Sequence, residues 1–172
     1  MLKTFLTVGL LSLLCGSAFA QNQSSNTQTE NLIQSGLNPV YQKWLDETVA
    51  YIVTAEERRA FLLLKTNDER ERFIERFWQM RNPDPSASEN AYRVEYFRRV
   101  TTANRRFGSN VLPGWKTARG RLYITLGEPD EINKTSAREM WFYRHAGSLG
   151  NNVEIEFTSN LFTEEFHVRQ RP

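Results

Sequence analysis

Three acidic residues in the C-terminal half come nearest, in type and spacing, to an enzyme's acid–base pair. Asp130 and Glu131 are adjacent, and Glu139 follows shortly after them. Two carboxyl groups that face each other across a bound sugar support glycosidase-type hydrolysis. Acidic residues at the ends of strands more often keep the protein surface soluble than take part in catalysis. A carboxylate-dependent hydrolase acting on a glycan or peptide is therefore the alternative function, and no residue is assigned a catalytic role.

Histidine and cysteine offer little further chemistry. His145 and His167 are the two histidines, and neither has a Ser–Asp pattern nearby or a second histidine at metal-ligand spacing. Cys15 is the only cysteine. If processing removes it, the mature chain has no thiol for a disulfide, a nucleophile or a zinc site. We expect no metal site and no cofactor.

Aromatic and arginine residues suggest a binding surface instead. Trp115, Trp141 and Tyr143 would stack over a groove for a glycan or peptide, since aromatic rings offer large apolar faces. Arg119 and Arg121 would hold a carboxylate or phosphate. In the competing interpretation the rings pack in the core and the arginines form structural ion pairs. The acids considered for such pairs are Asp84, Asp130 and Glu139. The candidate binding residues are Trp115, Thr117, Arg119, Arg121, Trp141 and Tyr143.

The charge balance argues against nucleic acid as a partner. The chain has 22 Lys and Arg residues against 20 Asp and Glu residues, a formal net charge of +2. Loss of Lys3 with an export signal leaves +1, which is too little for an electrostatic nucleic-acid binder. Arginines on the expected helix 89–107 form either an anion-binding surface or, as we favour, a solvated face paired with acids.

The N-terminus has the pattern of an export signal. Lys3 precedes an apolar stretch over 4–14, and Ala18-Phe19-Ala20 fits the small-x-small cleavage pattern. We expect a signal peptide over residues 1–20 and a protein of the periplasm or cell surface. The alternative is a lipoprotein anchored at Cys15, although Leu14 stands where such signals usually have a small residue. No other apolar run is long enough to span a membrane, so the mature chain should have no transmembrane segment.

The remaining chain divides into a tether and a domain. Residues 21–37 are polar and bury too little surface to offset the entropy of ordering, which predicts a disordered tether. Residues 38–172 should form a single domain. Its helical signals are Asn38-Pro39, a capping box at Thr54, another at Thr66, and a serine cap at Ser86 or Ser88. The expected helices cover 39–48, the segments after Thr54 and Thr66, and 89–107, with an extended segment at 49–53.

The hydrophobic period changes from 3.6 to 2 after Gly108. Apolar residues then alternate with polar ones, which is typical of an antiparallel sheet with one packed face. We expect strands at 121–126, 140–144, 153–158 and 165–169. Helices followed by strands predict an α+β fold, with N-terminal helices packed on one face of a small C-terminal antiparallel sheet.

The turns around the first expected strand are rich in glycine. Gly114, Gly120 and Gly127 lie where the chain would enter or leave it, and glycine tolerates a positive φ there. Pro129 pre-sets a turn, and the Asp130 side chain can cap it. These five residues are predicted to be structural.

Several motifs together resemble one known family. They are Pro113-Gly114-Trp115-Lys116-Thr117, then Arg119-Gly120-Arg121-Leu122-Tyr123-Ile124, then Gly127-Glu128-Pro129-Asp130-Glu131-Ile132. Upstream stand Phe77-Trp78 with Arg81-Asn82-Pro83-Asp84-Pro85, and downstream Glu139-Met140-Trp141-Phe142-Tyr143-Arg144. The combination resembles the GWxTD domain family over roughly residues 41–169.

The resemblance implies a bacterial exported protein and supplies no activity or catalytic residues. The Asp that names the family's motif is Ala118 in this sequence. We therefore expect a binding or assembly module at the cell envelope, with an envelope protein or a cell-wall glycan as its partner. The carboxylate-dependent hydrolase stays open as the alternative.

Overall fold

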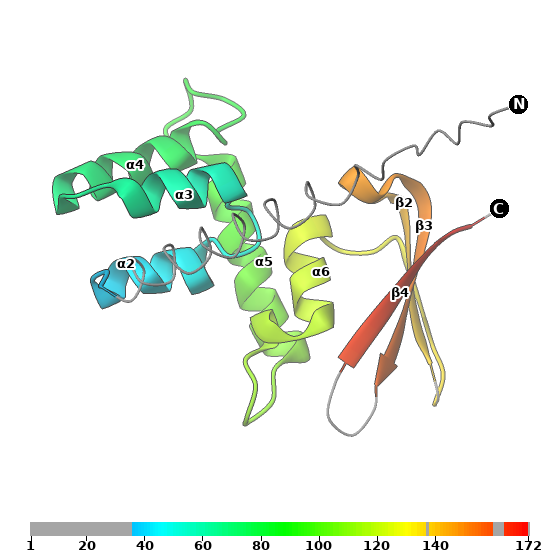
Figure 1. Cartoon of the computed structure of the whole chain (residues 1–172). Coiled ribbons are helices and arrows are strands. Elements are labelled where there is room, and N and C mark those ends of the chain that lie inside the picture. Colours follow the sequence, from blue (N-terminus) through cyan, green and yellow to red (C-terminus); the bar gives the residue numbers. More distant parts are fainter. Residues whose placement is uncertain (1–35, 137, 160–163, 172) are drawn as a thin grey trace, which may run out of the picture. The chain divides into compact units, whose positions relative to one another are not determined.

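The computed structural model describes residues 36–136, 138–159 and 164–171 (Figure 1). The expected signal peptide, Cys15 and nearly all of the expected tether lie outside these residues. The chain forms two compact units, one ending at Thr66 and the other beginning at Asn67.

The first unit contains α2 (Pro39–Lys43), a π-helical turn η1 (Trp44–Thr48) and α3 (Ala55–Leu63). The predicted start at Asn38 is confirmed, since its side chain accepts a hydrogen bond from the Val40 N–H at 3.0 Å. The capping box is also confirmed. Thr54 Oγ1 accepts from the Glu57 N–H at 3.1 Å, and Glu57 Oε2 accepts from the Thr54 N–H at 2.9 Å.

Aromatic rings make the core of this unit. The Phe61 ring lies 4.8 Å from the Trp44 ring and 6.0 Å from the Tyr41 ring, centroid to centroid. The extended segment predicted over 49–53 is wrong. Val49 is fully buried, and its carbonyl accepts hydrogen bonds from both the Ile52 and Val53 N–H groups at 2.9 Å. The chain therefore turns there, and burial rather than strand formation accounts for the apolar residues.

The second unit opens with α4 (Asn67–Gln79) and α5 (Ala91–Phe107). Asn90 caps α5, not Ser86 or Ser88. Its Oδ1 accepts from the Arg93 N–H at 3.1 Å, and its Nδ2 donates to the Trp78 carbonyl at 2.6 Å. One side chain thus starts α5 and ties it to the end of α4.

The two helices pack through aromatic rings. The Trp78 ring lies 5.8 Å from Tyr96 and 5.5 Å from Phe97. Two large side chains of this segment lie outside the core: Tyr92 of α5 is exposed, and Met80 is 74% exposed. Met80 follows the last residue of α4, so it no longer belongs to the helical face.

The strand predicted over 121–126 is wrong, because these residues belong to helix α6 (Ala118–Leu126). The alternation of Leu122, Ile124 and Leu126 with polar residues is only six residues long. Such a short pattern does not separate a strand from a helix. Buried residues of α6 lie on several sides of the helix, so it shows no single apolar stripe. They are Ala118, Gly120, Leu122, Tyr123 and Ile124.

A four-stranded antiparallel sheet follows, in the order β1-β2-β3-β4. The strands are β1 (Glu131–Lys134), β2 (Glu139–His145), β3 (Asn151–Ser159) and β4 (Glu164–Gln170). The last three confirm predicted strands, and the hairpin expected between His145 and Asn152 is present. β1 was not predicted. All four of its residues are exposed, so it has no pattern of alternating burial.

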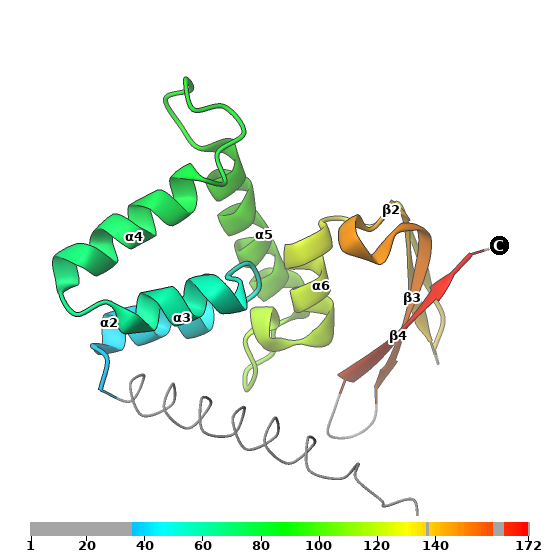
Figure 2. The ribbon, with the colours of Figure 1, turned by 45° about the horizontal axis from the view of Figure 1, so that its top comes forward.

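Helix α6 lies against one face of this sheet, and α5 packs on the other side of α6 (Figures 1 and 2). Phe107 of α5 packs 5.5 Å from Trp141 of β2, and the Arg121 guanidinium of α6 lies 5.6 Å from the Phe166 ring of β4. The strand register places Trp141, Ile155 and Val168 side by side on this inner face. The α+β class is therefore confirmed, with α6 against the sheet and α5 reaching it through Phe107 at its C-terminal end. No helix in the described ranges is long and apolar enough to cross a bilayer.

Candidate functional site

The residues that resemble the family motif form the junction between α5 and α6. A 3₁₀ turn η2 (Gly114–Lys116) begins the junction, and the Trp115 N–H donates to Asn104 Oδ1 of α5 at 3.0 Å. Gly114 lies so close to α5 that a Cβ there would overlap the Ala103 carbonyl. A Cβ on Gly120 would overlap the Gly114 carbonyl in the same way.

The close packing of neighbouring backbone, and not a positive φ, therefore explains why positions 114 and 120 are glycine. The described glycines with a positive φ are Gly127, Gly147 and Gly150. The predicted role of Gly114 and Gly120 as strand-flanking turns is wrong, because a helix follows them. Their structural importance is of another kind: they let η2 and the first turn of α6 pack backbone to backbone on α5.

Thr117 is the N-cap of α6. Its Oγ1 accepts a hydrogen bond from the Gly120 N–H at 2.9 Å and donates to the Gly114 carbonyl at 2.8 Å. Ala118, where the family has Asp, is the first residue of the helix and is 4% exposed. The cap of this helix is thus filled by Thr117 without an acid at the next position.

Arg119 pairs with Glu139, one of the acids considered for it. Its guanidinium lies 3.2 Å from the Glu139 carboxylate, which also receives the Lys134 ammonium at 3.2 Å and the Trp141 indole N–H at 2.9 Å. Burial pushes the pKa of the Glu139 carboxyl upward, but the bonds from Trp141 and Lys134 and the charge of Arg119 outweigh it. The net pKa lies below its usual value, so Glu139 is a poor general acid at neutral pH.

Trp141 and Tyr143 lie in the core. Trp141 is fully buried, and its ring lies 4.7 Å from that of Phe157. The Tyr143 hydroxyl donates to the Gly127 carbonyl at 3.1 Å, and burial raises the pKa of this phenol. Trp141 is 0% and Tyr143 2% exposed, so neither ring is available to stack on a ligand in the described structure.

Trp115 and Arg121 are the predicted binding residues nearest the surface. Trp115 is half-buried, with the Lys116 ammonium 5.0 Å from its ring. Arg121 is exposed and lies over Phe166. The six candidate residues therefore do not converge on one place: Thr117 caps a helix, Arg119 pairs with an acid, and two aromatic residues pack in the core.

The turn after α6 contains three of the residues that the sequence predicts to be structural. Gly127 has φ 89°, Pro129 is buried, and the Asp130 N–H donates to the Phe142 carbonyl at 2.8 Å. The Asp130 carboxylate accepts from the Arg144 N–H at 2.8 Å and pairs with its guanidinium at 2.7 Å. These contacts lower the pKa of Asp130, the bond from the Arg144 backbone first.

The acids considered for hydrolysis do not face one another. Glu131 lies opposite Phe142 in the β1–β2 register, whereas Glu139 points to the same side as Trp141. Side chains alternate between the faces of a strand, so Glu131 and Glu139 lie on opposite faces of the sheet. Asp130 is engaged with Arg144. Among the described residues, no group of three or more His, Cys, Asp or Glu side chains could hold a metal ion.

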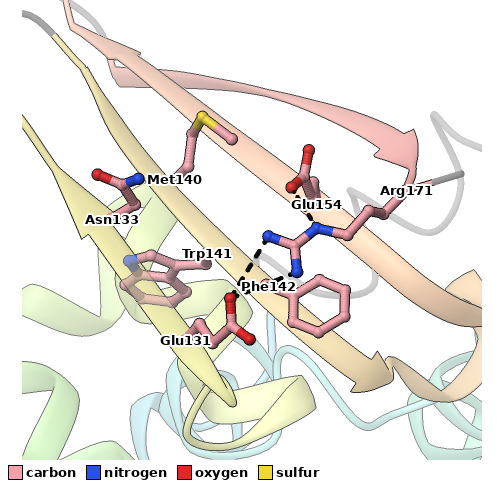
Figure 3. Close-up of a pocket in the computed structure, with 7 residues that line it drawn as sticks. All are labelled: Glu131, Asn133, Met140, Trp141, Phe142, Glu154 and Arg171. Atoms are coloured by element: carbon pink, nitrogen blue, oxygen red, sulfur yellow. Dashed lines mark hydrogen bonds and ion pairs between the residues drawn. The ribbon is translucent and has the colours of Figure 1, made fainter.

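The outer face of the sheet holds a small hollow that sequence reasoning missed (Figure 3). Arg171 lies 3.9 Å over the Phe142 ring, with its Nε 2.7 Å from Glu154 and a second nitrogen 3.3 Å from Glu131. The bond from Arg171, followed by that from Arg169, lowers the pKa of Glu154. The hollow is lined by Glu131, Asn133, Met140, Trp141, Phe142, Glu154 and Arg171.

This hollow is much smaller than a usual site for a small molecule. Its volume is about 60 Å³, whereas small-molecule sites usually span about 300–1,000 Å³. Its charged groups are already paired across strands β1, β3 and β4. No sequence signal distinguishes these residues from ordinary polar positions on the wet side of a sheet, so the network becomes visible only through the strand register.

Three arginines of the basic face of α5 are paired with acids, which is the interpretation that we favoured. Glu95 accepts from Arg98 at 2.6 Å and from Arg99 at 2.8 Å, and Arg106 contacts Glu128 at 2.7 Å. The bonds from Arg98 and then Arg99 lower the pKa of Glu95 to about 2. These arginines therefore bind acids of the same unit and do not form an open anion site.

The geometry now places the motif residues at the α5–α6 junction and at the turn into the sheet. The family model of the GWxTD domain matches residues 17–171. The chain belongs to the GWxTD domain family. No curated protein and no solved structure matches it. In this GWxTD domain the glycine and the threonine of the motif build the α5–α6 junction, and Ala118 follows the cap directly.

Proposed function

We propose that this GWxTD domain is exported and acts as a binding or assembly module at the bacterial cell envelope. Its partner adds an extended segment to the free edge of strand β4. The export pattern of residues 1–20 supports the location. The position of β4, a seven-residue strand at the edge of the sheet, supports the mode of binding. Edge strands bind extended peptides through main-chain hydrogen bonds.

One hydrogen bond fixes which backbone groups of β4 point outward. The Arg171 N–H donates to the Asn152 carbonyl of β3 at 2.7 Å. In an antiparallel pair these bonds recur at every second residue, so the backbone groups of His167 and Arg169 also point to β3. The N–H and C=O groups of Phe166 and Val168 then point away from the sheet, where a partner strand would bond them.

The two edges of the sheet differ in their protection. β1 is only four residues long and ends in Lys134. Short edge strands and lysines are the usual devices that prevent pairing with another chain. β4 is longer and contains no proline or lysine, and Val168 is 43% exposed on its inner side. The edge of β4 is therefore the one suited to a partner.

The hydrolase alternative gains no support from a specific observation. Asp130, Glu131 and Glu139 each contact an arginine and lie apart from one another. A hydrolase needs two carboxyl groups that converge on the substrate. The binding proposal needs only the outward backbone groups of β4 and an extended partner.

A proline pair tests the proposal. Val168→Pro removes an outward N–H and blocks the edge, while bonds to β3 stay intact. His167→Pro removes an inward N–H and should instead unfold the sheet. We expect wild-type chain immobilised in native envelope extract to retain a partner that Val168→Pro loses with little change in melting temperature. Amide exchange at Phe166 and Val168 should slow in the complex.

Two results would contradict the binding proposal. Equal retention of every partner by wild type and a folded Val168→Pro variant would remove the role of the edge. Hydrolysis of envelope glycan or peptide by the wild type, lost in Glu139→Gln, would favour the hydrolase. Circular dichroism of each variant shows whether the sheet is intact.

A further inference from the structure

We infer that the extended segment which β4 takes up is β4 of a second copy of this chain, so that two sheets join edge to edge. This inference rests on the proposed use of the β4 edge and names its partner. The argument comes from the order of charged and apolar residues along the strand, Glu164–Gln170. This order of residues is self-complementary when an identical strand runs antiparallel beside it.

The geometry of an antiparallel pair limits the choice of register. Residues directly opposite each other point to the same face. Two identical strands related by a twofold axis must therefore be centred on one residue. His167 is the midpoint of β4, and a pair centred there uses all seven residues of both strands.

In this register the charges are complementary on the outer face. Glu165 lies opposite Arg169 of the partner subunit, and the twofold axis repeats the pair. Glu165 is exposed and forms no ion pair with another residue of the described chain. Arg169 already contacts Glu154 at 2.8 Å and Glu156 at 4.0 Å, but its side chain remains 52% exposed and can contact a further carboxylate. Opposite charges directly across strands stabilise pairing, and like charges oppose it.

The neighbouring registers fit less well. A pair centred on Val168 would place His167 opposite Arg169 of the partner subunit. It would also place Glu165 opposite Arg171 of the partner subunit, whose guanidinium already contacts Glu131 and Glu154. A pair centred on Phe166 would place Glu165 opposite His167 of the partner subunit and leave Arg169 beyond the end of the partner's strand. The register centred on His167 gives both Glu165 and Arg169 an oppositely charged neighbour, and we therefore choose it.

The inner face and the backbone fit the same register. Phe166 lies opposite Val168 of the partner subunit, so the exposed apolar edge is covered on both copies. Burial of apolar surface of this kind drives association. Phe166 and Val168 are also the residues whose N–H and C=O groups point outward. Each exchanges two main-chain bonds with its opposite residue, as in a hydrogen-bonded antiparallel pair.

A single cysteine at the axis tests the register. The two copies of His167 form a non-hydrogen-bonded pair, in which the Cα atoms lie about 4.5 Å apart. That distance is within the range of a disulfide, about 4.4–6.8 Å. Cys15 is the only native cysteine, so Cys15→Ser gives a thiol-free full chain. In this background His167→Cys should form a disulfide-linked dimer under mild oxidation.

Glu165→Cys is the matched control. In the proposed register its thiol faces Arg169 of the partner subunit and lies about 13 Å along the strand from the other introduced thiol, at about 3.3 Å per residue. We expect this variant to stay monomeric on a non-reducing gel. Linkage of both variants alike would indicate random collision and would overturn the register.

Sedimentation of the thiol-free chain gives an independent measurement. The chain should form a dimer, Val168→Pro should be a monomer, and Glu165→Arg should weaken the dimer at least tenfold because it faces Arg169 of the partner subunit. A monomeric wild type at the highest soluble concentration, together with no linkage of His167→Cys, would overturn the inference.

The outcomes also separate this inference from the proposed function. If the chain is monomeric but Val168→Pro still loses an envelope partner, edge binding stands and self-pairing fails. If His167→Cys links and Val168→Pro retains every envelope partner, self-pairing stands and the uptake of an envelope segment at this edge fails.

Discussion

The Tyr143 hydroxyl donates its hydrogen bond to the main-chain carbonyl of Gly127, at a distance of 3.1 Å. This bond joins the middle of β2 to the residue that ends α6. Gly127 has φ 89° and ψ −163°, a region open in practice to glycine alone. The end of helix α6 and one inner strand of the sheet, β2, therefore meet at one backbone position.

Replacement of Gly127 by valine should destabilise the domain by about 1–3 kcal/mol. Two causes add: a β-branched residue is strained at this φ, and its Cβ would lie 3.1 Å from the Arg99 guanidinium. Gly147→Val is the control, because Gly147 also has a positive φ but nothing lies within 4 Å of an added Cβ. Urea unfolding of both variants measures the difference. An equal loss would show that backbone strain alone matters.

Removal of the Tyr143 hydroxyl should cost about 0.5–1.5 kcal/mol, the usual net contribution of an intramolecular hydrogen bond. The Tyr143→Phe variant keeps the ring in the core and loses only the bond to Gly127. Tyr92→Phe, at an exposed tyrosine of α5, should change stability by less than about 0.5 kcal/mol. Equal unfolding midpoints for wild type and Tyr143→Phe would mean that the bond contributes nothing.

The sequence predicts the elements whose signal is local. The capping box at Thr54 and the long helix that ends at Phe107 are examples, because caps and a sustained apolar stripe depend on nearby residues. The sheet after Glu139 follows for the same reason, since apolar and polar residues alternate along the sequences of β3 and β4. The α+β class needs no more than these elements.

Local sequence signals do not predict helix α6 or strand β1. α6 is buried on several sides, so its apolar residues obey no helical period, and three of them happen to alternate. The polar sequence of β1 shows no alternation at all. The mistaken strand at α6 also changes the roles assigned to residues of the candidate site. With α6 read as a strand, Thr117 and Gly120 become turn residues, whereas tertiary packing makes them a helix cap and a point of close contact.

Acid should destabilise the domain through Glu95. Its pKa is about 2 in the folded chain against 4.5 for the free side chain, chiefly because of the bonds from Arg98 and Arg99. Between these values the unfolded chain binds more protons, so this contribution is present above about pH 4.5 and is lost as the pH falls toward 2. The Glu95 side chain is 40% exposed, and solvent screening reduces its size.

Unfolding free energies measured from pH 7 to pH 2 test this. Glu95→Gln should be less stable than wild type at neutral pH, and the gap should close in acid. Glu89→Gln, at an exposed acid just before α5, is the control and should follow the wild-type curve. A constant gap for Glu95→Gln at all pH values would show that its ionisation does not matter.

Thr117→Ala should destabilise the domain by about 1 kcal/mol, because it leaves the Gly120 N–H without its cap. Thr117→Ser keeps the hydroxyl and should retain most of the stability. Thermal melts of the two variants compare them directly. Equal losses for alanine and serine would assign the effect to the lost methyl group and not to the cap.

The restored family residue, Ala118→Asp, is expected not to stabilise the domain. Thr117 already fills the cap, so the acid gains at most the interaction with the helix N-terminus, about 0.3–1 kcal/mol. Against this, position 118 is 4% exposed, and burial of a polar group without full compensation costs about 1–3 kcal/mol. We therefore expect stability at neutral pH to be unchanged or lower by up to about 2 kcal/mol.

The pH dependence distinguishes the two possible roles of that acid. A buried carboxylate without partners has a raised pKa in the fold, so its penalty is present at neutral pH and is relieved at pH 3. A capping carboxylate has a lowered pKa, so it would show a gain at neutral pH that disappears at pH 3. Thermal melts of wild type, Ala118→Asp and the uncharged Ala118→Asn at both pH values separate charge from size. A gain at neutral pH, together with a smaller cost of Thr117→Ala in the Ala118→Asp background, would establish the acid as a cap and contradict this prediction.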